Sequence, residues 1–184
     1  MEEYVTIHSA ASGNYSHAEG YSTSAPGENS HAEGRYASAY GRDSHAEGYS
    51  TLASGNCSHA EGLGTEASGE NSHAEGWLTI ASGADSHAEG NHTIASNGQH
   101  AQGRFNIEDT SNTYAHIVGN GSSFARSNAH TLDWDGNAWF EGDIYVGSTS
   151  GTNKDDGSKK LATEEYVDNS GGVYYANMAS ESSL

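Results

Sequence analysis

The pentapeptide SHAEG at residues 16–20 is the first of six identical copies that recur every 14 residues. The other five copies occupy residues 30–34, 44–48, 58–62, 72–76 and 86–90. A seventh, degenerate copy, HAQG, follows one residue early at 100–103. Repetition at a fixed period is typical of solenoid proteins, whereas low-complexity linkers lack such a register. We therefore expect the repeat region to be folded.

A second motif, TxASG, lies between the copies and is clearest at residues 51–55, 65–69 and 79–83. Alanine and glycine thus recur every seven residues, so each 14-residue unit has two similar halves. A coiled coil needs two apolar positions per heptad, and a glycine in a helix interior costs about 1 kcal/mol. One alanine and one glycine per half therefore exclude this helical solution. The pattern predicts an all-β fold, a parallel β-solenoid with two short strands per 14-residue coil.

The alternation of side chains in a strand assigns the faces of this solenoid. In SHAEG the alanine points to one face and the histidine and glutamate point to the other. Because alanine recurs in both halves, we expect it to fill a narrow interior, with glycines at the sharp bends. The predicted roll core is Ala18, Ala25, Ala32, Ala46, Ala53, Ala60, Ala67, Ala74, Ala81 and Ala88.

The composition limits the partners of the chain. Hydrophobic residues make up 33% of the sequence, and 25 acidic against 7 basic residues give a net charge of -18. This balance argues against nucleic-acid binding, which needs a basic face, and no apolar run is long enough for membrane insertion. We also expect no signal peptide at the start of the sequence. Since an alanine core buries little apolar surface, the roll is expected to be an obligate oligomer.

The repeat resembles the head repeat of the YadA-like trimeric adhesins, whose consensus is NSVAIG. The match is clearest in NSHAEG at residues 29–34 and 71–76, and it extends over about residues 9–103. The resemblance implies a left-handed parallel β-roll (the Hep/Hag repeat fold) that associates side by side as a homotrimer. His and Glu stand where that family has Val and Ile, which form apolar trimer contacts, so the chemistry of the interface must differ.

The remaining sequence resembles tail-fibre or neck-appendage proteins of phages and prophages of Gram-positive bacteria. This similarity is carried by HAQG at 100–103, YAHIVGNG at 114–121 and RSNAHTLDWDGNAWF at 126–140. It implies a structural and adhesive fibre module in the virion, placed at the tail or an appendage and used for attachment to a host cell-surface receptor. A glycan is one candidate for that receptor.

The repeated histidines and glutamates should form two parallel columns on the outer face. We assign them to a trimer-interface ladder made of His17, Glu19, His31, Glu33, His45, Glu47, His59, Glu61, His73, Glu75, His87 and Glu89. In the preferred interpretation, the histidine of one chain meets the glutamate of the next and is held partly charged, so that the trimer responds to pH between about 5 and 8.

Two other interpretations of the columns stay open. In the second interpretation both columns are solvated, and the repetition reflects duplication. In the third, three histidines from three chains bind a metal ion on the threefold axis; His92 and His100, near the end of the array, are the most favourable positions for such a site. Because the sequence has no HxH pair and no dedicated ligand cage, we predict no metal site and no cofactor.

Variable residues follow each SHAEG copy and are expected at a turn on the surface. An aromatic edge of this kind is suited to carbohydrate stacking or to packing against a neighbouring chain. Its residues include Tyr21, Arg35, Tyr36, Tyr49, Leu63 and Trp77. Cys57 occupies a slot that holds Asn or Asp in other coils, and we interpret it as a tolerated substitution. A single cysteine also excludes an intrachain disulfide.

The sequence after Arg104 loses the 14-residue period. Alternating runs around Asp135-Gly136 predict a hairpin, and we expect a small β-rich, intertwined trimeric clamp. Its predicted core is Trp134, Trp139, Phe140, Ile144 and Val146. A short helix is expected at residues 161–168. The predicted organisation is the roll at 1–103, the clamp at 104–147, and a linker, short C-terminal helix and tail at 148–184.

These observations favour a non-enzymatic role. Ser16 and His17 point to opposite faces of one strand, which excludes a serine–histidine nucleophile there. The first alternative to a phage fibre is the head of a bacterial trimeric adhesin at the cell surface. The second is a glycan-cleaving tailspike, for which Asp133, Asp135, Glu141 and Asp143 are the acidic candidates.

Overall fold

The computed structural model describes residues 9–142, 145–146 and 159–160. All regular structure in this part of the chain is β-strand or isolated bridge, without a helix. Within the same residues, no helix is long and apolar enough to span a membrane. The chain divides into two compact units, Met1–Trp139 and Phe140–Leu184. The all-β parallel solenoid predicted from the repeat is confirmed.

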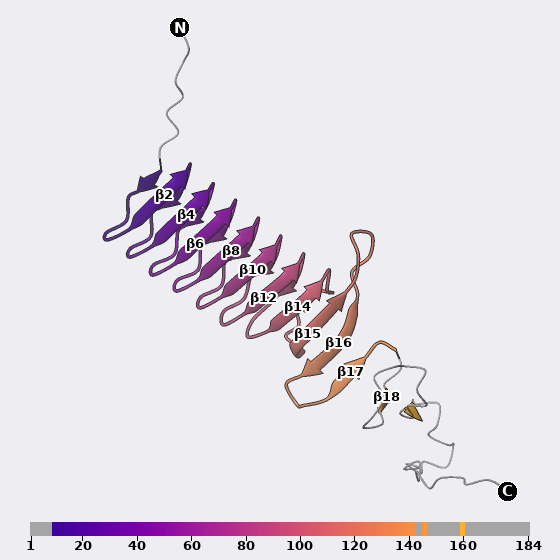
Figure 1. The fold of residues 1–184 in the computed structure, drawn as a ribbon. Helices are drawn as coiled ribbons and strands as arrows, with labels where there is room; N and C mark the ends of the chain where they lie inside the picture. Colours follow the sequence, from indigo (N-terminus) through magenta and orange to yellow (C-terminus); the bar gives the residue numbers. More distant parts are fainter. Residues whose placement is uncertain (1–8, 143–144, 147–158, 161–184) are drawn as a thin grey trace, which may run out of the picture. The chain divides into compact units, whose positions relative to one another are not determined.

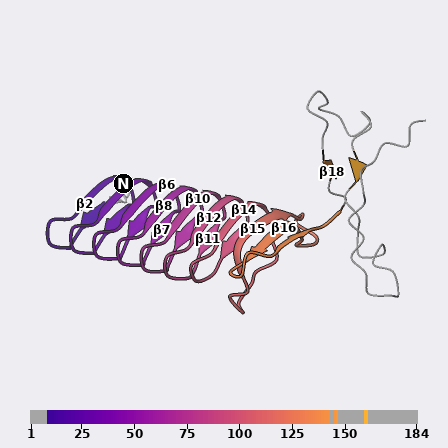
Figure 2. The same cartoon turned by 90° about the horizontal axis from the view of Figure 1, so that it is seen from below.

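Each coil of the solenoid contributes one five-residue strand and one two-residue strand, to two different sheets (Figures 1 and 2). The long strands are β2 (His17–Tyr21), β4 (His31–Arg35), β6 (His45–Tyr49), β8 (His59–Leu63), β10 (His73–Trp77), β12 (His87–Asn91) and β14 (His100–Arg104). The short strands are β1 (Ala10–Ala11), β3 (Ser24–Ala25), β5 (Ser38–Ala39), β7 (Leu52–Ala53), β9 (Glu66–Ala67), β11 (Ile80–Ala81) and β13 (Ile94–Ala95).

The strands pair in parallel with identical residues side by side. His59 pairs with His73, for example, and Glu61 with Glu75, and this register holds from β2 to β12. The strict 14-residue spacing is the cause, because it returns each residue type to the same position one coil later. Each residue type of the SHAEG motif therefore forms a column along the stack.

Four small residues fill the interior of a typical coil. Two are alanines and two are hydroxyl residues, such as Ser58 and Thr65. The serine hydroxyl donates to the carbonyl oxygen of the glycine three residues earlier, as from Ser58 to Gly55 at 2.7 Å. Of the alanines predicted as core, all but the half-buried Ala18 are fully buried, as are Ala37, Ala39, Ala95, Ala101 and Ile117.

Glycine is required where neighbouring coils approach most closely. Gly62 has a φ of +106°, and a Cβ atom on it would lie 2.3 Å from the carbonyl oxygen of Gly76. The second glycine column has an ordinary φ but is tighter still, since a Cβ on Gly55 would lie 1.8 Å from the oxygen of Gly69. The glycines therefore permit close coil stacking as well as bending.

The residue before each buried serine has a left-handed backbone. Asn29, Asp43, Cys57, Asn71 and Asp85 have φ values of 55–56°. Asn and Asp tolerate this conformation better than most residues, which explains their recurrence in the slot. Asn29 also donates to the Asp43 carboxylate at 2.9 Å across the coils. Cys57 is thus accommodated in an unfavourable conformation.

The sheet of long strands continues beyond residue 103, where the predicted roll ended. Strand β15 (Tyr114–Asn120) pairs in parallel with β14, and β16 (Asn128–Asp133) then pairs with β15 in antiparallel orientation. Strand β17 (Ala138–Phe140) is the next neighbour in the sheet. The turn predicted at Asp135-Gly136 joins β16 to β17, with a hydrogen bond of 2.9 Å from the Asp133 amide to the Asn137 carbonyl.

Three of the predicted clamp residues can be placed, and they form no core among the described residues. Trp134, Trp139 and Phe140 are 54%, 64% and 45% exposed. They lie on the hairpin of β16 and β17, the outer strand pair of the sheet. The side chains of Ile144 and Val146 lie outside the described residues, as does the helix expected at 161–168. In the second unit, β18 (Tyr145–Val146) pairs with β19 (Lys159–Lys160) in antiparallel orientation.

Candidate functional site

The histidines of the long strands form a continuous stack of imidazole rings on the outer face. From His31 to His100, neighbouring ring centroids lie 4.7–4.8 Å apart, with interplanar angles of at most 9°. This spacing equals the distance between paired β-strands. His17 caps one end with a tilted ring at 5.0 Å. The parallel register, rather than any local motif, thus aligns the rings.

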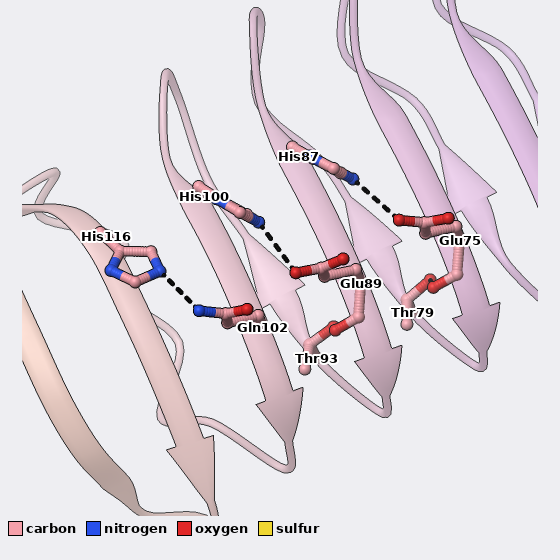
Figure 3. Close-up of polar contacts among 8 residues, drawn as sticks. All are labelled: Glu75, Thr79, His87, Glu89, Thr93, His100, Gln102 and His116. Atoms are coloured by element: carbon pink, nitrogen blue, oxygen red, sulfur yellow. Dashed lines mark hydrogen bonds and ion pairs between the residues drawn. The ribbon is translucent and has the colours of Figure 1, made fainter.

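The glutamates two residues later form a second column beside the histidines. Near the start of the stack, histidine Nε2 approaches the glutamate of its own strand, as in His31–Glu33 at 3.8 Å. Near the end it approaches the glutamate of the preceding coil (Figure 3), at 3.4 Å in His87–Glu75 and 3.3 Å in His100–Glu89. Each imidazole nitrogen in the centre of the stack therefore lies beside carboxylates from two coils.

The imidazole nitrogens are poorly satisfied in the single chain. The Nε2 atoms are covered from solvent and make no hydrogen bond, although carboxylate oxygens lie nearby. This holds for His31, His45, His59, His73, His87 and His100. The Nε2–Oε separations fall in the ion-pair range but lack hydrogen-bond geometry. The outer face therefore presents histidine Nε2 atoms that make no hydrogen bond and that could act as metal ligands.

Burial shifts the protonation of two histidines of the column, His45 and His73, toward the neutral form. The pKa of His45 is lowered from its ordinary value, first by burial and then by the neighbouring imidazoles, while the glutamates partly oppose this. The pKa of His73 is lowered for the same reasons. The partly charged form expected from the sequence is therefore disfavoured at His45 and His73 in the single chain.

The histidine column continues past the repeats, a feature that the 14-residue period does not predict. His100 pairs with His116, whose ring lies 5.6 Å from that of His130. Gln102 replaces the glutamate in this coil, and its amide nitrogen lies 3.0 Å from His116 Nε2 (Figure 3). Burial also lowers the pKa of His116. The HAQG match was the only available signal for this extension.

A shallow groove of about 640 Å³ runs beside the glutamate column. Glycines of the long strands line it together with four glutamates, Glu19, Glu33, Glu47 and Glu61. The missing glycine side chains leave the groove open, and the carboxylates make it acidic. It is suited to cations or to donor-rich surfaces and not to phosphates.

The columns also bring metal-ligand types together in a regular pattern. Three clusters each combine the glutamate of one coil with the histidine and glutamate of the next, and a fourth contains two histidines and one glutamate. Within each cluster the ligand atoms lie within 4.8 Å of one another. The clusters are Glu33/His45/Glu47, Glu47/His59/Glu61, Glu61/His73/Glu75 and His87/Glu89/His100. Imidazole with carboxylate is a suitable ligand set for zinc.

The variable residues form an exposed aromatic edge, as the repeat predicted. Arg35 lies over the rings of Tyr21, Tyr36 and Tyr49, with its guanidinium carbon 5.1–5.6 Å from the ring centroids. Further along, Trp77 is 49% exposed and contacts His92 at 5.2 Å. This edge presents ring faces and one cation to solvent, which suits contacts with sugars or proteins.

Asp133, one of the acidic residues considered for glycan cleavage, has a local structural role. The Asp133 carboxylate accepts hydrogen bonds from the Asp135 amide and from the amide and side chain of Asn137, at 2.7–3.0 Å. These bonds lower its pKa, whereas a glycosidase acid needs a raised one. Asp133 therefore acts as the organiser of its turn. Asp143 lies outside the described residues.

Comparisons with known proteins give no match, either to a protein-family model or to a curated sequence. The assignment of function therefore depends on the geometry of the two surfaces and on the sequence pattern.

Proposed function

We propose that the chain is a structural and adhesive module of a homotrimeric fibre, of the kind found in phage or prophage tails. The observation that carries this proposal is the constant register of the stack, which displays one continuous His–Glu face and one aromatic edge. A rigid scaffold with repeated surfaces suits side-by-side association and multivalent attachment. The pattern of the YadA-like head repeat supports the same function.

The interior of the stack supports oligomerisation. Its core consists of alanine with buried serine and threonine, so each coil buries little apolar surface. Association of three chains through the His–Glu face would cover the exposed parts of the histidine and glutamate side chains. The exposed rings of Trp134, Trp139 and Phe140 would form the intertwined clamp at the base of the trimer.

In this proposal the aromatic edge contacts the host surface. Tyr49 and Trp77 are the last residues of their long strands, and both rings are exposed to solvent. Host attachment through cell-wall glycans would use stacking of sugars on these rings. The virion is then the expected location of the protein.

Binding of the labelled full chain to a panel of cell-wall fragments from Gram-positive bacteria tests this function. The edge variant combines Tyr49→Asn and Trp77→Asn, because Asn91 already occupies the equivalent position. Tyr40→Ser is the matched control, since Tyr40 is an exposed ring outside the edge and serine fills its slot in other coils. We expect at least tenfold weaker binding for the edge variant and no change for the control. Absence of binding across the panel, or an equal loss in both variants, would overturn the proposal.

A further inference from the structure

We propose that the His–Glu face of a single chain binds divalent transition-metal ions, with zinc as the representative ion, in sites that link neighbouring coils. The inference does not depend on the fibre function, because all ligands of each site come from one chain. It also differs from a metal site on a trimer axis, which would require histidines from three chains.

The ligand geometry supports such sites. Ligands around tetrahedral zinc at about 2.0–2.1 Å are separated from one another by about 3.3 Å. His100 Nε2 and Glu89 Oε1, two ligands of the His87/Glu89/His100 cluster, are already 3.3 Å apart. The three-ligand clusters, with ligand atoms within 4.8 Å, need only small side-chain rotations to close on an ion. Water completes the coordination, since the side chains are about one-third exposed.

The electrostatics of the face favour a cation. Glutamates repeat in register on adjacent strands, and like charges directly opposite one another are destabilising. Histidine nitrogens that make no hydrogen bond lie beside these carboxylates. A divalent ion would satisfy both columns at once.

The presence of nitrogen in each cluster selects the class of ion. Magnesium and calcium prefer sites made of oxygen ligands, whereas imidazole favours zinc, nickel, copper and iron. Each cluster contains at least one histidine. We therefore expect zinc and cobalt to bind in the presence of excess magnesium.

The overlap of the clusters predicts a definite stoichiometry. The cluster containing His59 shares Glu47 with the preceding cluster and Glu61 with the following one. The other three clusters, built around His45, His73 and the His87/His100 pair, have no ligand in common. Of the four clusters, three can therefore be filled without sharing a carboxylate, and we expect three ions per chain.

The same overlap provides a matched control on the same column. His73→Gln removes an independent cluster and should lower the stoichiometry from three ions to two. His59→Gln is an identical substitution in the neighbouring coil, but it removes only the shared cluster and should leave three ions bound. Gln102 already occupies the glutamate column of this face, which indicates that the stack accepts a glutamine side chain.

The experiment loads the chelator-treated full chain with Zn²⁺ in excess Mg²⁺ and measures metal per chain by mass spectrometry after gel filtration. Circular dichroism verifies the fold of each variant, and Co²⁺ absorption reports coordination directly. The inference is supported by ratios of three, two and three for wild type, His73→Gln and His59→Gln. Fewer than one ion per wild-type chain would overturn it, as would equal losses in the two variants, which is the result expected for three-chain sites on an axis.

Discussion

Replacement of Gly62 by alanine should disrupt the stack between two central coils. The added methyl would lie 2.3 Å from the Gly76 carbonyl oxygen, and the residue would have to keep a φ of +106°. A strained backbone of this kind costs about 1–3 kcal/mol, and overpacking typically costs about 1–3 kcal/mol. We therefore expect the free energy of unfolding to fall by about 2–6 kcal/mol.

Two further glycine variants separate these contributions. Gly55→Ala tests steric contact alone, because its φ is ordinary and its Cβ would lie 1.8 Å from the Gly69 oxygen, so it should cost about 1–3 kcal/mol or more. Gly136→Ala tests backbone strain alone, because its φ is +88° and no atom lies within 4 Å, so it should cost at most about 1–3 kcal/mol.

Urea unfolding followed by circular dichroism at one fixed protein concentration measures all three variants, since association shifts apparent stability. The order of destabilisation should place Gly62→Ala above Gly136→Ala. A Gly62→Ala chain within about 0.5 kcal/mol of the wild type would refute the reasoning, as would one more stable than Gly136→Ala.

Three other predictions follow from the described residues. Cys57→Asn should stabilise the fold by about 0.5–1 kcal/mol, because asparagine tolerates the left-handed φ of 56°; a lower midpoint in thermal unfolding would contradict this. In chelating buffer, the free energy of unfolding should be at its full value above about pH 6.5 and should fall as the pH decreases below that value. His45, His73 and His116 have lowered pKa values in the folded state, so the unfolded chain binds more protons. Urea midpoints that are constant between pH 7.5 and 5 would be inconsistent with this prediction. Asp133→Ala should open the turn and change the fluorescence of Trp134 and Trp139, since three hydrogen bonds to the carboxylate are lost; an unchanged spectrum would show that the carboxylate does not organise the hairpin.

Much of the solenoid could be predicted because the spacing of the repeats determines the register of the strands. A constant interval of 14 residues places His59 beside His73 and Glu61 beside Glu75, whatever the details of the turns. The alanine interior follows from the same alternation. Buried Ser58 and Thr65 were not predicted, because hydroxyl residues are ordinarily exposed and their burial depends on hydrogen bonds and close packing that only the coil geometry reveals.

The end of the stack was less predictable. His100 and His116 are 16 residues apart, so the interval that identified the other histidines fails there, and only strand pairing brings them together. A buried carboxylate, Asp109, holds this irregular coil by accepting hydrogen bonds from Gln99, Thr113 and Tyr114. No repeat marks these residues. The exposed tryptophans of the hairpin show that apolar composition alone does not locate a core within one chain.

The sequence could not predict that histidines approach the glutamate of the preceding coil. The pattern placed both residues on one face, but the distances of 3.3–3.4 Å in His100–Glu89 and His87–Glu75 depend on side-chain rotamers. These contacts change the interpretation of the columns. They combine ligand atoms between coils of one chain, in addition to offering a surface to neighbouring chains.

Absolute mass by light scattering on a sizing column tests the central claim of a homotrimeric fibre module most directly. The chain has a mass of 19.2 kDa, so a trimer at pH 7.5 should give three times this value. A mass of one chain at pH 7.5, across the concentrations used for the binding experiments, would contradict the account.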